Sequence, residues 1–430
     1  MRIAYFCDRM LLITIFIVGY LFIVFEHSLQ LNKAASALLT GVLCWTVYIA
    51  SQNPETANHE LLKHLGDISG ILFFLLGALT IVELIDAHDG FDIITSRIHT
   101  LSRKKLLVIV ALIAFVLSAL LDNLTTAIVM MSLIRQLVRD NEDRMYYGGM
   151  VIIAANAGGA FSPIGDVTTT MLWVNGQISS WNIISKLFIP SLVSMLVPLL
   201  WMSLKMKGNV KRPEINLQTT KRPTTKRERY IVFFSGTFIL LLVPVFKSVT
   251  HLPPFMGILL GLAVLWTITE FIHKKKNDED RGSFSVAGAL QRVDTQSVLF
   301  FLGILLAISA LESNGILTSL AHKMDSVIGN LNITTLAIGL SSAVVDNVPL
   351  VAAAQAMYPL SAFPMDHYFW ELLAYCAGTG GSILIIGSAA GIAVMGLEHI
   401  RFMWYLKRIS FPALLGYLAG AAVYIGIQAI

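Results

Sequence analysis

Five polar residues lie in apolar parts of the chain, where each could bind a cation or carry a proton. Asp122-Asn123 and Asp346-Asn347 each follow an apolar run, and Asp166 follows a segment rich in glycine. A carboxylate at the centre of a bilayer costs about 3 kcal/mol on insertion scales, so such a residue is a functional candidate by default. Carboxylate and amide oxygens are hard donors, which suit Na⁺ or Li⁺ better than soft metals. These residue types therefore predict cation and proton chemistry.

Other oxygen donors near these residues complete the candidate site. The expected cation- and proton-binding residues are Asp122, Asn123, Thr125, Asn156, Asp166, Thr168, Thr169, Ser342, Asp346, Asn347, Ser382 and Ser388. Those expected to hold Na⁺ are Asp122, Asn123, Asp166, Asp346 and Asn347. No Arg or Lys occurs in these segments, so the acids should be protonated, bound to a cation or open to water. Because burial favours the protonated form and a nearby cation favours the carboxylate, proton and sodium would compete for one charge.

Most candidates also have a purely structural interpretation. Asn123 and Asn347 could cap helices, and Thr168 and its two neighbours could bond back to helix carbonyls. Asp67 and Asp294 each precede an apolar run, so stabilisation at the positive end of a helix explains them as well as a proton relay does. An Asp-Asn pair that recurs in both halves of the chain is harder to explain by capping, and it favours a site.

The composition predicts the elements that position these residues. The 430 residues are 56% hydrophobic and 13% charged, with a mean hydropathy of +0.72. Apolar runs such as 71–85, 231–246 and 414–427 approach the roughly 20 residues that cross a bilayer as a helix. The expected fold class is an all-α polytopic membrane protein in contact with lipid. The net charge of +4 comes mostly from loops, so we expect no nucleic-acid partner, and no cofactor is indicated.

The two halves of the chain resemble each other, with offsets of 224 and 222 residues between matched positions. The matched positions are Asp122 with Asp346, Gly158-Gly159 with Gly380-Gly381, and Gly165 with Gly387. The pattern predicts two inverted repeats, each with about five transmembrane helices and one re-entrant hairpin. Glycine pairs and Pro163 should break helices near the membrane midplane, where broken backbone is tolerated only if it lines a cavity or is buried in protein.

The boundaries of the repeats follow from these matches. The first repeat is expected at residues 1–206, with a hairpin at about 104–139 and a broken helix at about 146–175. The second is expected at 230–430, with a hairpin at about 331–358 and a broken helix at about 367–396. Residues 207–229, basic and containing two prolines, are expected to form a cytoplasmic linker.

Lys and Arg are distributed unevenly among the loops. If the segments around Asp122 and Asp346 re-enter the membrane, the basic clusters all fall on one side. These clusters lie at 97–105, 135–144, 205–229, 274–292 and 401–408. The positive-inside rule then places the basic loops in the cytoplasm. The membrane is expected to be a bacterial inner membrane.

The stretches 73–83, 118–126 and 156–173 closely resemble the NhaD-type bacterial sodium/proton antiporters, members of the ion transporter superfamily. The resemblance extends over essentially the whole chain. It implies scaffold helices that hold a homodimer, and a transport region made of two hairpins and two broken helices. Similar superfamily members move that region as an elevator.

The resemblance also implies which residues act. The matching functional positions are Asp122, Asn156, Asp166, Thr168, Thr169, Ser342 and Asn347, with Asp67 and Asp294 as possible relay residues. Asp67 replaces a Glu expected in relatives, which keeps the charge but shortens the reach. Ser388 is the counterpart of Asp166 in the second half, so the site is asymmetric in charge.

The predicted function is secondary active transport that exports Na⁺, and Li⁺ as well, in exchange for H⁺, rather than enzymatic catalysis. One alternative is a sodium-coupled dicarboxylate or citrate carrier of the same superfamily, although those proteins carry Ser-Asn-Thr at both hairpin tips, and an acid there would repel an anion. A metalloid exporter is a weaker alternative. A remote one is an intramembrane aspartyl protease, whose Gly-x-Gly-Asp motif differs from Pro163-Ile164-Gly165-Asp166.

Overall fold

The structure, a computed structural model, describes residues 2–91, 93, 98, 100–212, 224–274, 282 and 284–429. The basic residues Arg97, Lys275, Lys276 and Arg281 and the linker residues 213–223 lie outside this range. Within the described residues, seven helices are long and apolar enough to cross a membrane. The prediction of an all-α polytopic membrane protein is confirmed.

The seven long helices come from both halves of the chain. They are α3 (Lys33–Ser51), α4 (Pro54–Ala87), α10 (Ser180–Lys205), α11 (Lys226–Thr250), α12 (Pro254–His273), α15 (Thr295–Ser313) and α22 (Ser410–Gln428). Outside the site, the remaining helices are α1 (Arg2–Val24), α2 (Glu26–Leu29), α14 (Val286–Arg292), α16 (Ile316–Ile328) and α21 (Phe402–Arg408).

Eight shorter helices form pairs in which a short non-helical segment separates two helices. They are α6 (Arg103–Leu120) with α7 (Asn123–Leu137), α8 (Asn141–Ala160) with α9 (Val167–Val174), α17 (Leu331–Ser341) with α18 (Asn347–Met357), and α19 (Tyr368–Gly380) with α20 (Ala389–Glu398). The interruptions contain the candidate site residues Asp122, Asp166, Asp346 and Ser388. The chain therefore brings its polar residues to helix ends inside an apolar protein.

Local capping explains where several long helices begin. Asn32 and Asn53 accept hydrogen bonds from the backbone N–H groups of Ala34 and Glu55, at 2.8 and 3.0 Å. Thr225 and Glu228 form a reciprocal capping box at the start of α11. Such side chains satisfy N–H groups that the first turn of a helix leaves unpaired.

Asp67 does not lie where the sequence suggested. It is inside α4, which begins at Pro54, so stabilisation at a helix N-terminus does not explain it. The polar stretch before the apolar run contains Glu, Leu and Lys, which favour a helix, and it therefore extends α4 upstream. Asp294, in contrast, is the N-cap of α15, where its Oδ1 accepts from the backbone N–H of Ser297 at 3.1 Å.

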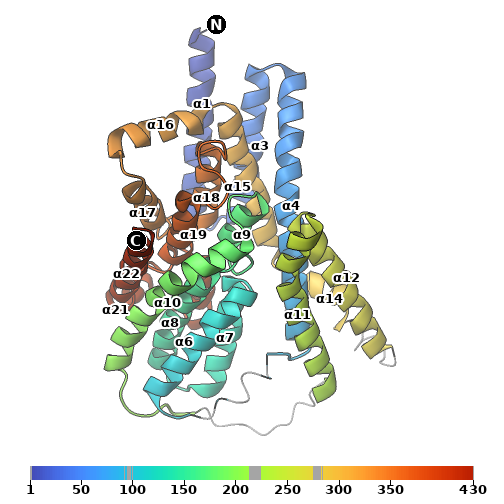
Figure 1. The fold of residues 1–430 in the computed structure, drawn as a ribbon, viewed down its shortest axis with the longest axis vertical. Helices are drawn as coiled ribbons and strands as arrows, with labels where there is room; N and C mark the ends of the chain where they lie inside the picture. Colours follow the sequence, from blue (N-terminus) through green and yellow to red (C-terminus); the bar gives the residue numbers. More distant parts are fainter. Residues whose placement is uncertain are drawn as a thin grey trace.

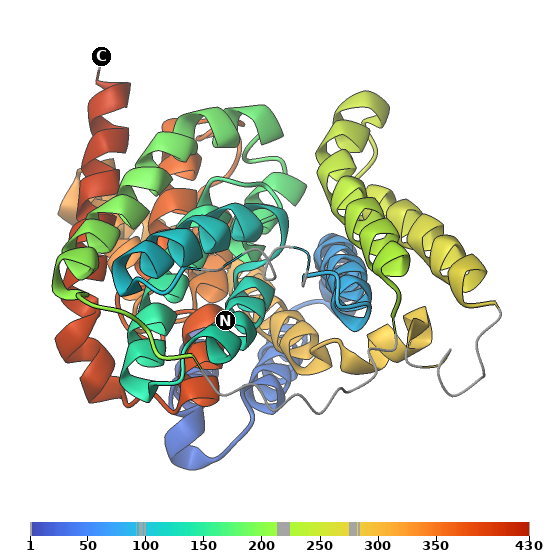
Figure 2. The same cartoon turned by 90° about the horizontal axis from the view of Figure 1, so that it is seen from below.

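Figure 1 shows α6 and α7 in the lower half of the molecule and α17 and α18 in the upper half. The helix ends that adjoin the basic loops lie at the lower end of the molecule. They are the start of α6, the α7–α8 connection, the end of α10, the start of α11 and the end of α12. Figure 2 shows α11 and α12 beside α4, set apart from the larger group that contains α6 to α10 and α17 to α22. α3 and α15 pack with their backbones in contact, since a Cβ on Gly303 would lie 2.4 Å from the carbonyl carbon of Ala37.

Candidate functional site

Four short helices begin at candidate residues. Asp122, Asp166, Asp346 and Ser388 are the N-caps of α7, α9, α18 and α20, and each side chain accepts from a backbone N–H of its own helix. The positive end of a helix stabilises a negative charge. Each of the three acids is therefore stabilised in part by the backbone of the helix that it caps.

The interpretation of Asn123 and Asn347 as helix caps is wrong. They occupy the first positions of α7 and α18, and their side chains reach other parts of the molecule. Nδ2 of Asn123 donates to Oδ1 of Asn156 at 3.1 Å, and Nδ2 of Asn347 donates to Oδ2 of Asp166 at 3.2 Å. The two asparagines therefore connect the α6–α7 and α17–α18 pairs to the α8–α9 pair.

Asn156 extends one of these connections to the other half of the chain. Its Nδ2 donates to Oγ of Ser388 at 3.0 Å, and both residues are buried. Asn123, Asn156 and Ser388 thus form a hydrogen-bonded row across α7, α8 and the N-terminus of α20. The residues were predicted, but the order of their contacts was not.

Asp166 is buried and is held by groups from both halves. Its Oδ2 accepts from Oγ1 of Thr168 at 3.0 Å as well as from Asn347. The neighbouring Thr169 is fully buried, and among the described residues no hydrogen-bond partner exists for its Oγ1. A buried hydroxyl without a protein partner is an available oxygen donor for a bound ion or water.

Asp122 is held by its own helix. The backbone N–H and Oγ1 of Thr125 donate to the two carboxylate oxygens, at 2.8 and 2.6 Å. Thr126, which the sequence interpretation omitted, has a fully buried hydroxyl without a partner among the described residues. The only sign of Thr126 in the sequence was that a second threonine directly follows Thr125.

Ser342 and Ser382 bind backbone carbonyls. Oγ of Ser342 donates to the carbonyl oxygen of Ala377 at 3.1 Å, and Oγ of Ser382 donates to that of Thr379 at 2.6 Å. These contacts stabilise the ends of α17 and α19. Each hydroxyl oxygen keeps lone pairs that can accept a further ligand.

Two cavities follow one another along α4 and α15. One, of about 570 Å³, is lined by Asp67, His64 and Glu312. The other, of about 60 Å³, is lined by Asp122 and Asp294. The two possible relay acids therefore lie in different cavities, and Glu312 joins Asp67 in its cavity although the sequence did not mark it as a site residue.

The expectation that no basic residue neutralises the acids is wrong for Asp346. The sequence segments around the acids contain no basic residue, but the fold brings Lys33 from the start of α3 to Asp346. Nζ of Lys33 lies 3.7 Å from Oδ2 of Asp346 and 4.7 Å from the ring centroid of Phe300. Among the described residues, Asp122 and Asp166 have no such ion pair.

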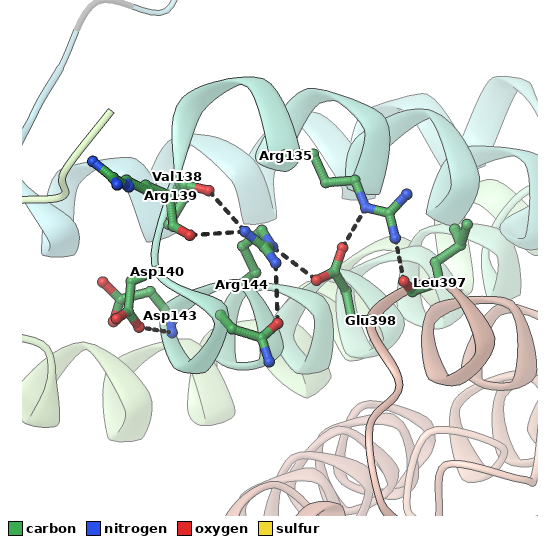
Figure 3. Close-up of polar contacts among 9 residues, drawn as sticks. Arg135, Val138, Arg139, Asp140, Asp143, Arg144, Leu397 and Glu398 are labelled. Carbon is green, nitrogen blue, oxygen red and sulfur yellow. Dashed lines mark hydrogen bonds and ion pairs between the residues drawn. The ribbon is translucent and has the colours of Figure 1, made fainter. Parts of the chain in front are cut away.

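A buried acid outside the predicted site fastens three helices together. Oε1 and Oε2 of Glu398, at the end of α20, accept from Nε of Arg135 and Nε of Arg144, at 2.6 and 2.8 Å. Figure 3 shows the two guanidinium groups converging on this carboxylate from α7 and α8, while Arg135 also donates to the carbonyl of Leu397. This Glu398 clamp, formed by Glu398, Arg135 and Arg144, ties the end of α20 to the α7–α8 connection.

Membrane-crossing helices, a buried acid at a helix end inside the protein and a cavity that reaches a second acid, Asp122, are features found in membrane transporters. A family model described as CitMHS, citrate transporter, matches residues 20–370, which is most of the chain. The chain belongs to this family of transporters.

Individual relatives carry more specific names. Sodium/proton antiporter 1 of Arabidopsis thaliana is 50% identical over 415 residues, which cover 96% of this chain and 72% of the relative. Sodium/proton antiporter 2 of the same plant is 46% identical, with 96% and 98% covered. The Na(+)/H(+) antiporter NhaD of Vibrio cholerae is 32% identical, with 96% and 90% covered. The predicted resemblance to the NhaD-type antiporters is confirmed.

Proposed function

We propose that this protein exchanges Na⁺ for H⁺ across a membrane, and that it carries Li⁺ as well. The observation that supports this most directly is Asp166, a buried acid that receives hydrogen bonds from Thr168 and Asn347 but has no basic partner among the described residues. A buried carboxylate without a fixed counter-charge must bind a proton or a cation. Relatives named sodium/proton antiporters agree with this chemistry.

The architecture that we propose for this function is two inverted repeats. The first comprises α1, α3, α4, the α6–α7 hairpin, the broken helix α8–α9 and α10; the second comprises α11, α12, α15, the α17–α18 hairpin, the broken helix α19–α20 and α22. The pairing of α3 with α15 is then matched by that of α12 with α4. The opposite positions of the two hairpins in Figure 1 support the inversion.

Equivalent contacts inside the two halves support the same repeat. Ser118 donates to the carbonyl of Ala155 at 2.6 Å, as Ser342 does to the carbonyl of Ala377. These serines lie four residues before Asp122 and Asp346, respectively. A duplicated and inverted architecture would place both hairpin tips and both helix breaks near the membrane midplane, where transported ions bind.

In the proposed cycle, Asp122, Asp166 and Asp346 exchange protons for Na⁺, which the oxygens of Asn123 and Asn347 help to coordinate. Na⁺ leaves the side of the basic loops, which the positive-inside rule places in the cytoplasm. Protons enter in return, which would contribute to pH homeostasis. In a bacterium, the inner membrane is the corresponding location.

The hairpins and broken helices would form the transport region, moving as an elevator against a scaffold that contains the α3–α15 and α4–α12 pairs and holds a homodimer. The cavities lined by Asp67 and by Asp294 support this view, because each is lined both by α4 and α15 and by helices of the proposed transport region. Residues 207–229 would then be a cytoplasmic linker between the repeats.

The family description keeps carriage of citrate or another carboxylate as a second candidate. Three acids at the helix N-termini argue against it, because they occupy the positive helix ends that would otherwise attract an anion. The exchange is tested with purified protein in liposomes that contain a pH-sensitive dye, to which Na⁺, Li⁺, K⁺, citrate and succinate are added in turn. We expect Na⁺ and Li⁺ to drive proton movement, and K⁺, citrate and succinate to drive none. Movement of citrate or succinate with sodium, and no cation-driven proton flux, would establish the carrier instead.

A further inference from the structure

The ion pair between Lys33 and Asp346 joins an element outside the candidate site to one of its acids. Lys33 is the first residue of α3, whereas Asp346 caps α18. Their side chains are 22% and 18% exposed, so water screens the pair only in part. No other described acid of the site has a basic partner of this kind.

Lys33 occupies a position that its own helix disfavours. The first turn of a helix carries partial positive charge, which repels a cation, and the first turn of α3 contains no acidic residue. The ammonium group finds its compensation outside α3, in the carboxylate of Asp346 and the ring face of Phe300. A residue that contradicts its local setting is expected to have a functional reason.

The contact between the two charges is loose. The separation of 3.7 Å exceeds the 2.7–2.9 Å typical of a tight charge-assisted hydrogen bond. Lys33 also lines a cavity of about 230 Å³, which two further acids, Glu26 and Asp294, line as well. The ammonium group therefore has free space beside it, and other acids along the same cavity, when it leaves Asp346.

We propose that Lys33 is a tethered cation that competes with transported Na⁺ for Asp346. In the conformation seen here it neutralises Asp346, and Na⁺ reaches this carboxylate only by displacing the ammonium group. The proposal rests on the Na⁺/H⁺ exchange proposed above. It assigns Lys33 to cation selection, because an internal cation sets the minimum affinity that a transported one must exceed.

The test is the apparent KM for Na⁺ in the dye-loaded liposomes. Lys33→Met removes the charge and keeps an apolar stem over Phe300, and Lys33→Gln is the second neutral variant. We expect each neutral variant to lower the KM by about fivefold, as expected for loss of a partly exposed competing charge. Lys33→Arg should keep the wild-type KM because it keeps the charge.

Two further variants make the result specific. Lys104→Gln, at an exposed position in the first turn of α6, should leave the KM unchanged. In an Asp346→Asn background, Lys33→Met should no longer change the KM, because the competed carboxylate is absent. A KM in both neutral variants equal to or above that of the wild type would overturn the proposal. A wild-type protein without Na⁺-driven proton movement would instead overturn the proposed exchange.

Discussion

The three acids of the site are surrounded by different partners, although all three cap helices. Among the described residues, Asp122 receives hydrogen bonds from Thr125 in its own helix, Asp166 is also contacted by Asn347, and Asp346 faces Lys33. Because hydrogen bonds and neighbouring charges decide how readily a carboxylate holds a proton or a cation, the three acids should not be interchangeable.

Asn347→Ala tests the contact between the two halves. The change removes a hydrogen bond to a charged group, worth about 1.5–3 kcal/mol. We expect it to raise the apparent KM for Na⁺ by about tenfold or more, with Asn58→Ala, at an exposed position of α4, as the control. Equal Na⁺ titrations for Asn347→Ala and the wild type would show that this contact does not support ion binding.

Sequence reasoning identified the residues of the site better than their partners. Asp-Asn pairs at the ends of apolar runs can be recognised in a single sequence, so Asp122 and Asp346 could be predicted. The contact between Asn156 and Ser388 joins residues 232 positions apart, and no local pattern indicates it. Lys33 was missed for the same reason, because its partner is separated from it by most of the chain.

The ends of the short helices are fixed by more than their own sequence. α7, α8 and α20 meet at the Glu398 clamp, in which a buried carboxylate accepts from two arginines. Removing one partner of a buried ion pair leaves the other charge uncompensated. The clamp therefore holds the end of a second-half helix against the α7–α8 connection of the first half.

Glu398→Gln should destabilise the protein by about 2 kcal/mol, since it removes the charged acceptor shared by two partly exposed arginines. The measurement is the thermal unfolding midpoint of the purified protein in detergent, which we expect to fall clearly. Glu142→Gln, at an exposed position in the first turn of α8, is the matched control and should not change the midpoint. Equal midpoints for all three proteins would mean that the clamp carries no stability.

Helix positions were easier to predict than helix starts. The apolar runs predicted at 71–85 and 231–246 lie within α4 and α11. The start of α4 was missed because its first turns are polar, and a hydropathy pattern does not distinguish a helix that extends beyond the membrane from a loop. Asp67 was consequently assigned to a helix end although it lies inside α4.

At the scale of the whole molecule, two cavities follow the same two helices, and the smaller one reaches the site at Asp122. The larger cavity is lined by α4 residues from Lys63 to Ile71, and the smaller by α4 residues from Phe74 to Val82. Exchange requires that the site be reached from the two sides of the membrane in turn. Because the acids have few fixed counter-charges, proton and Na⁺ should occupy the site alternately rather than together.

The central claim is that Asp166 couples the two ions, and the most direct measurement is Na⁺-driven proton flux in Asp166→Asn beside Asp140→Asn. Both residues are helix N-caps, and asparagine caps a helix about as well as aspartate, so the pair separates charge from folding. Asp140 is exposed at the start of α8. We predict that Asp140→Asn keeps the flux and that Asp166→Asn abolishes it. Wild-type flux in a folded Asp166→Asn protein would contradict the account.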